Sequence, residues 1–326
     1  MRSLIGDPTS DRPLTALLLL LSAVFILALQ DGLVKLISVQ TSFWQFQALR
    51  ALGNLIFAIV LAVIGGGLYL LKPKRAVVVY LRALLMTLCM FCFFAAAPFL
   101  TMTQMAAGLY TYPLFVSLLA GPVLGEQVGP WRLSALALGA VGAVLVLSPW
   151  EDGFSTMQCL PILAGFFYAV NILTIRRACR RENTLAMVFP VAVAFLLSGA
   201  LGSLVLTLFP LPAELQQGAP FVAIGWPMLT WIVVVFALLT SVLNFTGNLC
   251  LGRAYQTADS SWLAPLDFSY LLFAVFWGKA LFDTWPTMSA IAGMAFIGTA
   301  GVLTAWREGL HRNRIAAGRA AGQAIS

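Results

Sequence analysis

The feature that most constrains this chain is a succession of ten apolar segments. A transmembrane helix needs about 20 mostly apolar residues, and each segment is close to that length. We expect helices at 14–38, 43–64, 76–97, 102–124, 131–149, 157–175, 185–208, 226–248, 259–281 and 287–305. Hydrophobic residues make up 61% of the chain and charged residues 10%. A soluble domain of this composition would expose large apolar patches. The sequence therefore predicts an all-α integral membrane protein with ten transmembrane helices.

Basic residues indicate how these helices are oriented. If the N-terminus is cytoplasmic, fifteen of the nineteen Lys and Arg residues fall in cytoplasmic segments and none in external loops. The other four, Lys35, Arg50, Arg82 and Lys279, lie within spans or at their edges. The positive-inside rule therefore places both termini in the cytoplasm, in a bacterial-type inner membrane. Residues 1–13 and the basic segment 307–326 become cytoplasmic tails.

A degenerate internal repeat divides the chain. In each copy an apolar span ends at an acidic residue, a proline follows, and the next span carries a GxxG pair. The acids Glu126 and Asp283 are 157 residues apart, and the glycines Gly142 and Gly301 are 159 apart. Several matches at nearly constant offset indicate duplication.

The repeat predicts two halves, 14–149 and 150–306, with five spans each. Because five is odd, the halves must have opposite orientations in the membrane. Two inverted five-helix repeats are typical of secondary transporters, whose substrate sites lie between the repeats.

The first copy also resembles a known domain. Its run of Ala107, Pro113-Leu114-Phe115-Val116, Gly125-Glu126 and Gly142 resembles the EamA domain of the drug/metabolite transporter (DMT) superfamily. The second copy departs from that pattern at Lys279 and Asp283. The resemblance implies a transporter built from two EamA-like halves.

A second motif resembles one branch of that superfamily. It consists of Asp31-Gly32-x-x-Lys35 in the first span, Arg50 in the second and Leu81-Arg82 at the start of the third. The resemblance is to the branch related to S-adenosylmethionine carriers, which also includes exporters of amino-acid-like metabolites.

Polar residues inside the spans are the candidate site, because a buried charge needs a partner or a water-filled cavity. Asp31 and Lys35, one helical turn apart, can either form an ion pair or face a cavity. Arg82 can either snorkel to the interface or bind substrate, and the polar stripes of the fourth and eighth spans can equally hold helices together. The candidate substrate-binding residues are Asp31, Lys35, Gln47, Arg50, Asn54, Arg82, Gln104, Tyr168, Asn171, Asn244, Asn248, Asp267 and Tyr270.

These side chains favour a carrier of a small zwitterionic or anionic, amino-acid-like metabolite. Guanidinium groups at Arg50 and Arg82 match a carboxylate. Asp31 or Asp267 would face an ammonium group or carry a coupling proton, because burial disfavours a charged carboxylate while nearby cations favour it. The expected mechanism is alternating access, driven by protons or by exchange.

Other function classes have weaker signals. A membrane-embedded enzyme acting on a lipid or lipid-linked substrate is the alternative, but the chain has one histidine and no evident nucleophile and base. A purely structural subunit would leave the cost of the buried charges unexplained. Cys89 and Cys92 form C-x-x-C within an apolar segment, which favours packing residues over a metal site.

The expected partners are a small-molecule metabolite, membrane lipid and protons. The sequence contains no phosphate-binding GxxxxGK[ST] motif and no cluster of basic residues on one face, so we expect no cofactor, no metal and no nucleic acid. Monomer and homodimer both remain open, as does the direction of transport.

Overall fold

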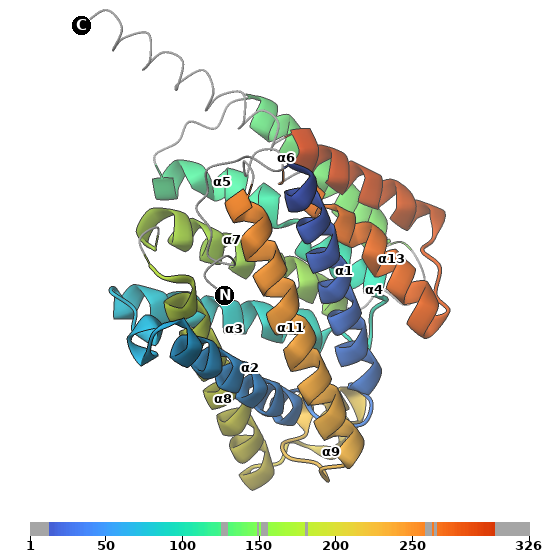
Figure 1. The fold of residues 1–326 in the computed structure, drawn as a ribbon. Coiled ribbons are helices and arrows are strands. Elements are labelled where there is room, and N and C mark those ends of the chain that lie inside the picture. The colour runs from blue at the N-terminus through green and yellow to red at the C-terminus, as the bar shows by residue number, and fades with distance from the viewer. Residues whose placement is uncertain are drawn as a thin grey trace, which may run out of the picture.

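The computed structural model describes residues 13–124, 130–148, 150, 156–179, 182–257, 263 and 266–303. All regular elements in these ranges are helical (Figure 1). The first half contains α1 (Pro13–Ile37), α2 (Phe43–Gly65), η2 (Leu68–Leu71), α3 (Ala76–Ala95), α4 (Met102–Leu109), α5 (Tyr112–Leu124) and α6 (Pro130–Leu147). The second half contains η3 (Thr156–Cys159), α7 (Leu160–Ala178), α8 (Thr184–Leu208), α9 (Ala213–Gly218), α10 (Pro220–Ala223), α11 (Trp231–Thr257) and α13 (Ser269–Phe282). A further apolar helix covers Met288–Leu303.

Six of the described helices are long and apolar enough to cross a membrane. Their outward faces remain apolar, as on α8, where Leu197, Leu201, Leu204 and Leu208 are each more than half exposed. These positions recur every three or four residues, so they line one face of the helix. The expected all-helical integral membrane protein is therefore confirmed. The number of ten spans and the inverted repeat remain predictions.

The fourth expected span, 102–124, is not one helix. α4 ends at Leu109, and α5 begins at Tyr112. Pro113 explains the break, because proline has no N–H to donate to the Leu109 carbonyl and its ring clashes with that carbonyl. The Thr111 hydroxyl instead donates to the Gly108 carbonyl at 2.7 Å.

Two expected spans in the second half also differ. The expected 226–248 helix is α11, which begins at Trp231 and extends nine residues further, to Thr257. The expected 259–281 helix is interrupted by a turn at Phe268, after which α13 begins at Ser269. Asp259 lies outside the described residues.

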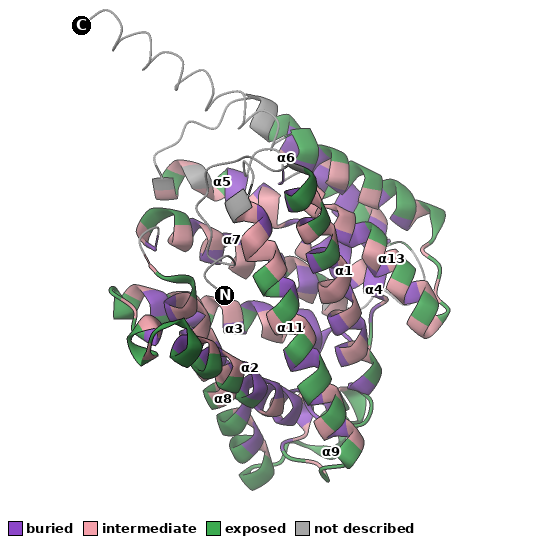
Figure 2. Ribbon diagram, viewed as in Figure 1, coloured by how far each residue is buried: buried purple, intermediate pink, exposed green. Residues whose placement is uncertain are grey.

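The helices of the two halves pack against each other. α1 lies between α11 and α13, α2 packs on α8 and α11, and α3 packs on α7 and α8 (Figure 1). α4 contacts α7 and α13. Buried positions face these contacts, while exposed positions face outward (Figure 2). Cys89 and Cys92 are buried free thiols in the largest core cluster, which agrees with a packing role.

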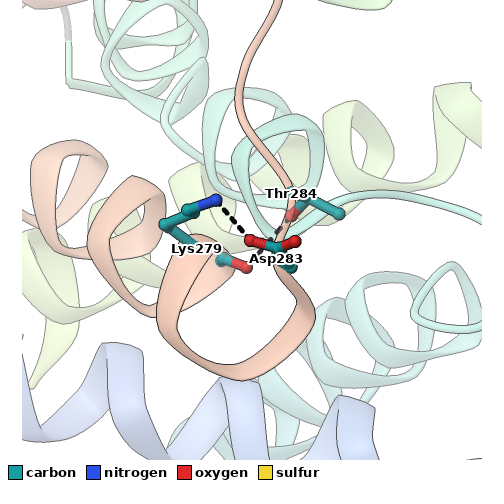
Figure 3. A network of polar contacts seen from close by, with 4 residues as sticks. Lys279, Asp283 and Thr284 are labelled. Carbon is teal, nitrogen blue, oxygen red and sulfur yellow. Dashed lines mark hydrogen bonds and ion pairs between the residues drawn. The ribbon is translucent and has the colours of Figure 1, made fainter.

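A local polar network caps the C-terminal end of α13 (Figure 3). Asp283 adopts a left-handed conformation with φ of 54°, and its carboxylate accepts a hydrogen bond from Lys279. The Thr284 hydroxyl donates to the Gly278 carbonyl at 3.1 Å. The Lys279 ammonium lowers the pKa of the exposed Asp283 carboxyl. The acid of the second repeat is thus a helix cap, while Glu126 of the first lies outside the described residues.

Candidate functional site

Asp31 is the centre of a hydrogen-bonded group that joins three helices. Its carboxylate accepts from the Tyr270 hydroxyl of α13 at 2.5 Å and from Gln30 Nε2 at 2.9 Å. Gln30 Oε1 in turn accepts from Asn244 Nδ2 of α11 at 3.0 Å. The structure therefore brings three of the predicted site residues, Asp31, Asn244 and Tyr270, into one hydrogen-bonded cluster. Gln30 was not predicted.

Lys35 does not take part in this cluster. Its ammonium donates to the Ala97 carbonyl at the end of α3 and lies 5.3 Å from the centre of the Phe282 ring. The ion pair considered for Asp31 and Lys35 does not form among the described residues. The reason is that Tyr270 and Gln30 occupy the carboxylate oxygens, while a backbone carbonyl is within reach of the lysine.

Among the described residues, Arg50 is the largest fully buried side chain, with 2% of its surface exposed. Its Nη2 donates to Gln47 Oε1 at 2.8 Å, and its guanidinium lies 5.2 Å and 5.9 Å from the ring centres of Phe94 and Phe195. The opposite charges of Arg50 and Asp31 act on each other electrostatically, although no hydrogen bond joins these two side chains within the described residues. The predicted polar stripe of α2 thus faces the protein interior.

The Arg50 stripe contains unmatched polar atoms. Gln47 Nε2, Arg50 Nε and Asn54 Oδ1 are buried without a hydrogen-bond partner among the described residues. Each unsatisfied buried group costs about 1–3 kcal/mol. Side chains that are 1–7% exposed cannot recover this cost from bulk water.

Asp267 forms a second carboxylate–tyrosine pair. Its carboxylate accepts from the Tyr112 hydroxyl at 3.1 Å. The Tyr112 ring meets the Tyr168 ring edge-on, with centres 4.9 Å apart, and contacts Tyr110 at 5.7 Å. We call Tyr110, Tyr112, Tyr168 and Tyr270 the tyrosine cluster.

The tyrosine cluster connects the two carboxylates. Tyr110 stacks on Tyr270, with ring centres 5.0 Å apart and planes at 12°. Tyr270 donates to Asp31, and Tyr112 donates to Asp267. A row of aromatic rings therefore runs between two partly buried acids, beside the breaks at Thr111 and Phe268. Sequence analysis missed Tyr110 and Tyr112. Two features of the sequence could have indicated them. They lie just before Pro113, and they are separated from Phe268 and Tyr270 by 158 residues each, which is within the offset of the repeat.

The other predicted site residues have separate contacts. Arg82 Nη1 donates to the Met187 carbonyl at 3.0 Å, so it joins α3 to α8. Gln104 closes a capping box with Thr101 at the start of α4, which is a structural use. Asn171 is 2% exposed, and its Oδ1 lacks a partner among the described residues. Asn248 is exposed and donates to the Asn244 carbonyl of its own helix, so it does not join the cluster.

The described residues include no group of three His, Cys, Asp or Glu side chains that could hold a metal ion. The polar groups that the structure brings together are two carboxylates, one guanidinium, amides and hydroxyls, beside aromatic rings. This set can bind a polar ring system, match either charge and exchange protons. Taken together, the site residues come from helices of both halves.

One part of the chain matches a known protein family. Residues 14–148 match the EamA-like transporter family. The likeness of this segment to an EamA domain, expected from its motif, is confirmed. The match covers less than half of the chain.

Two named relatives have similar sequences. A protein of Vibrio cholerae serotype O1 named riboflavin transporter is 29% identical over 198 residues, which are 60% of this chain and 59% of that protein. A riboflavin transporter of Rhizobium johnstonii is 28% identical over 204 residues, which are 62% of this chain and 59% of that protein. The chain thus matches about three fifths of the length of these relatives. They do not support the finer assignment to the branch of S-adenosylmethionine and amino-acid carriers.

One protein of known crystal structure matches most of the fold. Its TM-score is 0.56 at 20% identity, and the match covers 90% of this chain and 96% of that one. At this identity the likeness concerns the fold alone.

Proposed function

We propose that this chain is a secondary transporter that moves a small polar metabolite across a bacterial inner membrane by alternating access. In this proposal ten transmembrane helices form two inverted five-helix repeats, with both termini cytoplasmic. The substrate binds between the halves and leaves chemically unchanged. Three groups of observations support it: the EamA-like match, the relation between the halves, and the composition of the site.

The halves are related in their contacts as well as in their sequence. Tyr112 and Tyr270 are 158 residues apart (270 minus 112), within the offset of the sequence repeat. Each directly follows a helix break and donates its hydroxyl to a partly buried carboxylate. Interrupted helices at corresponding positions of two halves are typical of transporter binding sites.

The packing pattern is also consistent with this relation. Exchange of the halves pairs α1 with α7, α2 with α8 and α3 with α11. Under this exchange the α1–α11 contact corresponds to the α7–α3 contact, and the α2–α11 contact corresponds to the α8–α3 contact. All four contacts occur in the structure. A twofold pseudosymmetric arrangement has this property.

Contacts between the halves lie at both expected membrane surfaces. On the expected outer side, Ser42 Oγ donates to the Gly225 carbonyl at 2.5 Å and Gln45 Nε2 to the Pro227 carbonyl at 2.8 Å. On the expected cytoplasmic side, the Glu182 carboxylate accepts from two backbone N–H groups that precede α3, at 2.8 and 2.9 Å. Alternating access would break one set while keeping the other.

The tyrosine cluster is the observation that carries the substrate proposal. Offset-stacked and edge-to-face rings bind planar aromatic molecules by the same geometry in which they bind one another. A heteroaromatic metabolite of the riboflavin type would lie against these rings, with its polar edges facing the Arg50 stripe and the carboxylates. The names of the two relatives point to the same substrate class.

A zwitterionic or anionic amino-acid-like substrate is the second candidate. The opposite charges of the buried Arg50 and the partly buried Asp31, which act on each other electrostatically, favour it. A carboxylate would bind Arg50, and an ammonium group would bind Asp31. This candidate leaves the tyrosine cluster without a direct role.

Reconstitution into proteoliposomes separates these alternatives. We expect purified protein to take up labelled riboflavin faster than empty vesicles, and unlabelled amino acids not to compete. Inhibition by amino acids without riboflavin uptake would favour the second candidate. Chemical conversion of a lipid or of the added metabolite would instead indicate the membrane-enzyme alternative.

The same vesicles test proton coupling through Asp31. Asp31→Asn keeps the size of the side chain but cannot ionise, so we expect accumulation driven by a proton gradient to vanish while exchange survives in part. Asp267→Asn is the matched variant and should have a smaller effect. Accumulation by Asp31→Asn at the wild-type level would leave Asp31 as a structural acceptor for Tyr270.

A further inference from the structure

The three unmatched atoms of the Arg50 stripe define a hydrogen-bonding pattern. Gln47 Nε2 and Arg50 Nε are donors, and Asn54 Oδ1 is an acceptor. The Gln47 amide orientation follows from its Oε1, which accepts from Arg50 Nη2 at 2.8 Å. Residues 47, 50 and 54 lie on one face of α2 because they are spaced by three and four positions. A ligand that satisfies all three offers two acceptors and one donor.

Charge narrows the class of ligand further. The Arg50 guanidinium and the Asp31 carboxylate carry opposite charges that act on each other electrostatically, so each offsets part of the charge of the other. An added carboxylate would match the two donors but leave Asn54 Oδ1 without a donor. An added ammonium group would match Asn54 and leave the donors unmatched. The pattern therefore favours an uncharged ligand.

A cyclic imide meets these requirements. Its two carbonyl oxygens flank one ring N–H, and the group is planar and neutral. An amide side chain can accept from such an N–H while donating to the adjacent carbonyl, in the same way that Asn and Gln accept from N6–H and donate to N7 of adenine. Phe94 and Phe195, which lie against the Arg50 guanidinium, supply aromatic walls at this end of the site.

We infer that Gln47, Arg50 and Asn54 bind the imide edge of a heteroaromatic substrate, with Asn54 accepting the ring N–H. The inference rests on the proposed transport function, and it assigns a specificity-determining role to Asn54 that the charges alone do not give. Aromatic parts of the substrate then lie toward the tyrosine cluster.

The test compares riboflavin with its N3-methyl derivative, in which the imide N–H is blocked. Wild-type proteoliposomes should take up riboflavin at least about tenfold better than the derivative, since tenfold corresponds to about 1.4 kcal/mol, near the upper range for one hydrogen bond. Asn54→Leu should take up less riboflavin and lose most of this discrimination. Equal wild-type uptake of both compounds overturns the inference even if the variant does not fold.

A binding assay distinguishes this failure from failure of the proposed substrate. Thermal shift of the detergent-solubilised protein with riboflavin, lumichrome and N3-methyl-lumichrome reports ligand binding by mass action. Binding of lumichrome but not of its N3-methyl form, without riboflavin uptake, supports the imide site and rejects riboflavin as substrate. Riboflavin uptake with no effect of N3-methylation or of Asn54→Leu supports the transporter and overturns the imide site. No shift with any imide and no uptake rejects both.

Discussion

Arg50 shows why the residue type matters at this site. Its guanidinium simultaneously hydrogen-bonds Gln47 and lies against two phenylalanine rings. A planar, delocalised cation can do this, whereas the lysine ammonium is compact and strongly hydrated. These contacts therefore depend on the shape of the Arg50 side chain as well as on its charge.

At this scale we predict that Arg50→Lys lowers transport by at least about tenfold, or about 1.4 kcal/mol, and that Arg50→Ala abolishes it. Initial rates in proteoliposomes, with equal reconstituted protein, measure the effect. Arg176→Lys offers a control for a conservative change near a helix end, because the side chain is exposed. Wild-type rates for Arg50→Lys would reduce Arg50 to a counter-charge for Asp31.

At the scale of elements, glycine decides how closely α8 approaches α2. A Cβ added at Gly199 would lie 2.7 Å from the Ala48 nitrogen and 2.8 Å from the Trp44 carbonyl oxygen. Backbone atoms cannot move aside as a flexible side chain can. The contact thus fixes α2 at the N-terminal end of the Arg50 stripe, beside Gln47.

We therefore predict that Gly199→Val destabilises the protein by about 1–3 kcal/mol, the usual cost of overpacking, and reduces transport by displacing Arg50. Thermal melting in detergent and vesicle uptake measure the two effects. Gly252→Val in α11 is the matched control, because nothing lies within 4 Å of the added Cβ. Equal melting temperatures for the two variants would contradict the close approach of α2 and α8.

At the scale of the whole molecule, membrane orientation remains a prediction of the basic residues. Labelling with an impermeant thiol reagent in intact cells tests it, in a background without the five native cysteines. A cysteine at Gln216, in exposed helix α9, should be labelled, and one at Lys74 should be protected. The opposite pattern would invert the topology and exchange the expected outer and cytoplasmic contacts between the halves.

The sequence by itself determined the membrane class, most helix ends and the polar face of α2. The length and periodicity of an apolar segment are local properties. Each segment can therefore be compared separately with the length that is needed to cross a bilayer. The EamA-like character of the first half was also evident in its motif. Asp31, Arg50 and Asp267 could be selected because a charge inside an apolar segment is conspicuous in any fold.

Only the tertiary structure decided which of these groups meet. Lys35 is one turn from Asp31 in sequence, yet it binds the Ala97 carbonyl, while Tyr270, 239 residues away, binds Asp31. The helix breaks at Thr111 and Phe268 bring the tyrosine cluster together from α4, α5, α7 and α13. Such partners depend on how distant helices pack, because a hydrogen bond or ring contact forms wherever packing brings the groups within a few ångströms, whatever their separation along the chain.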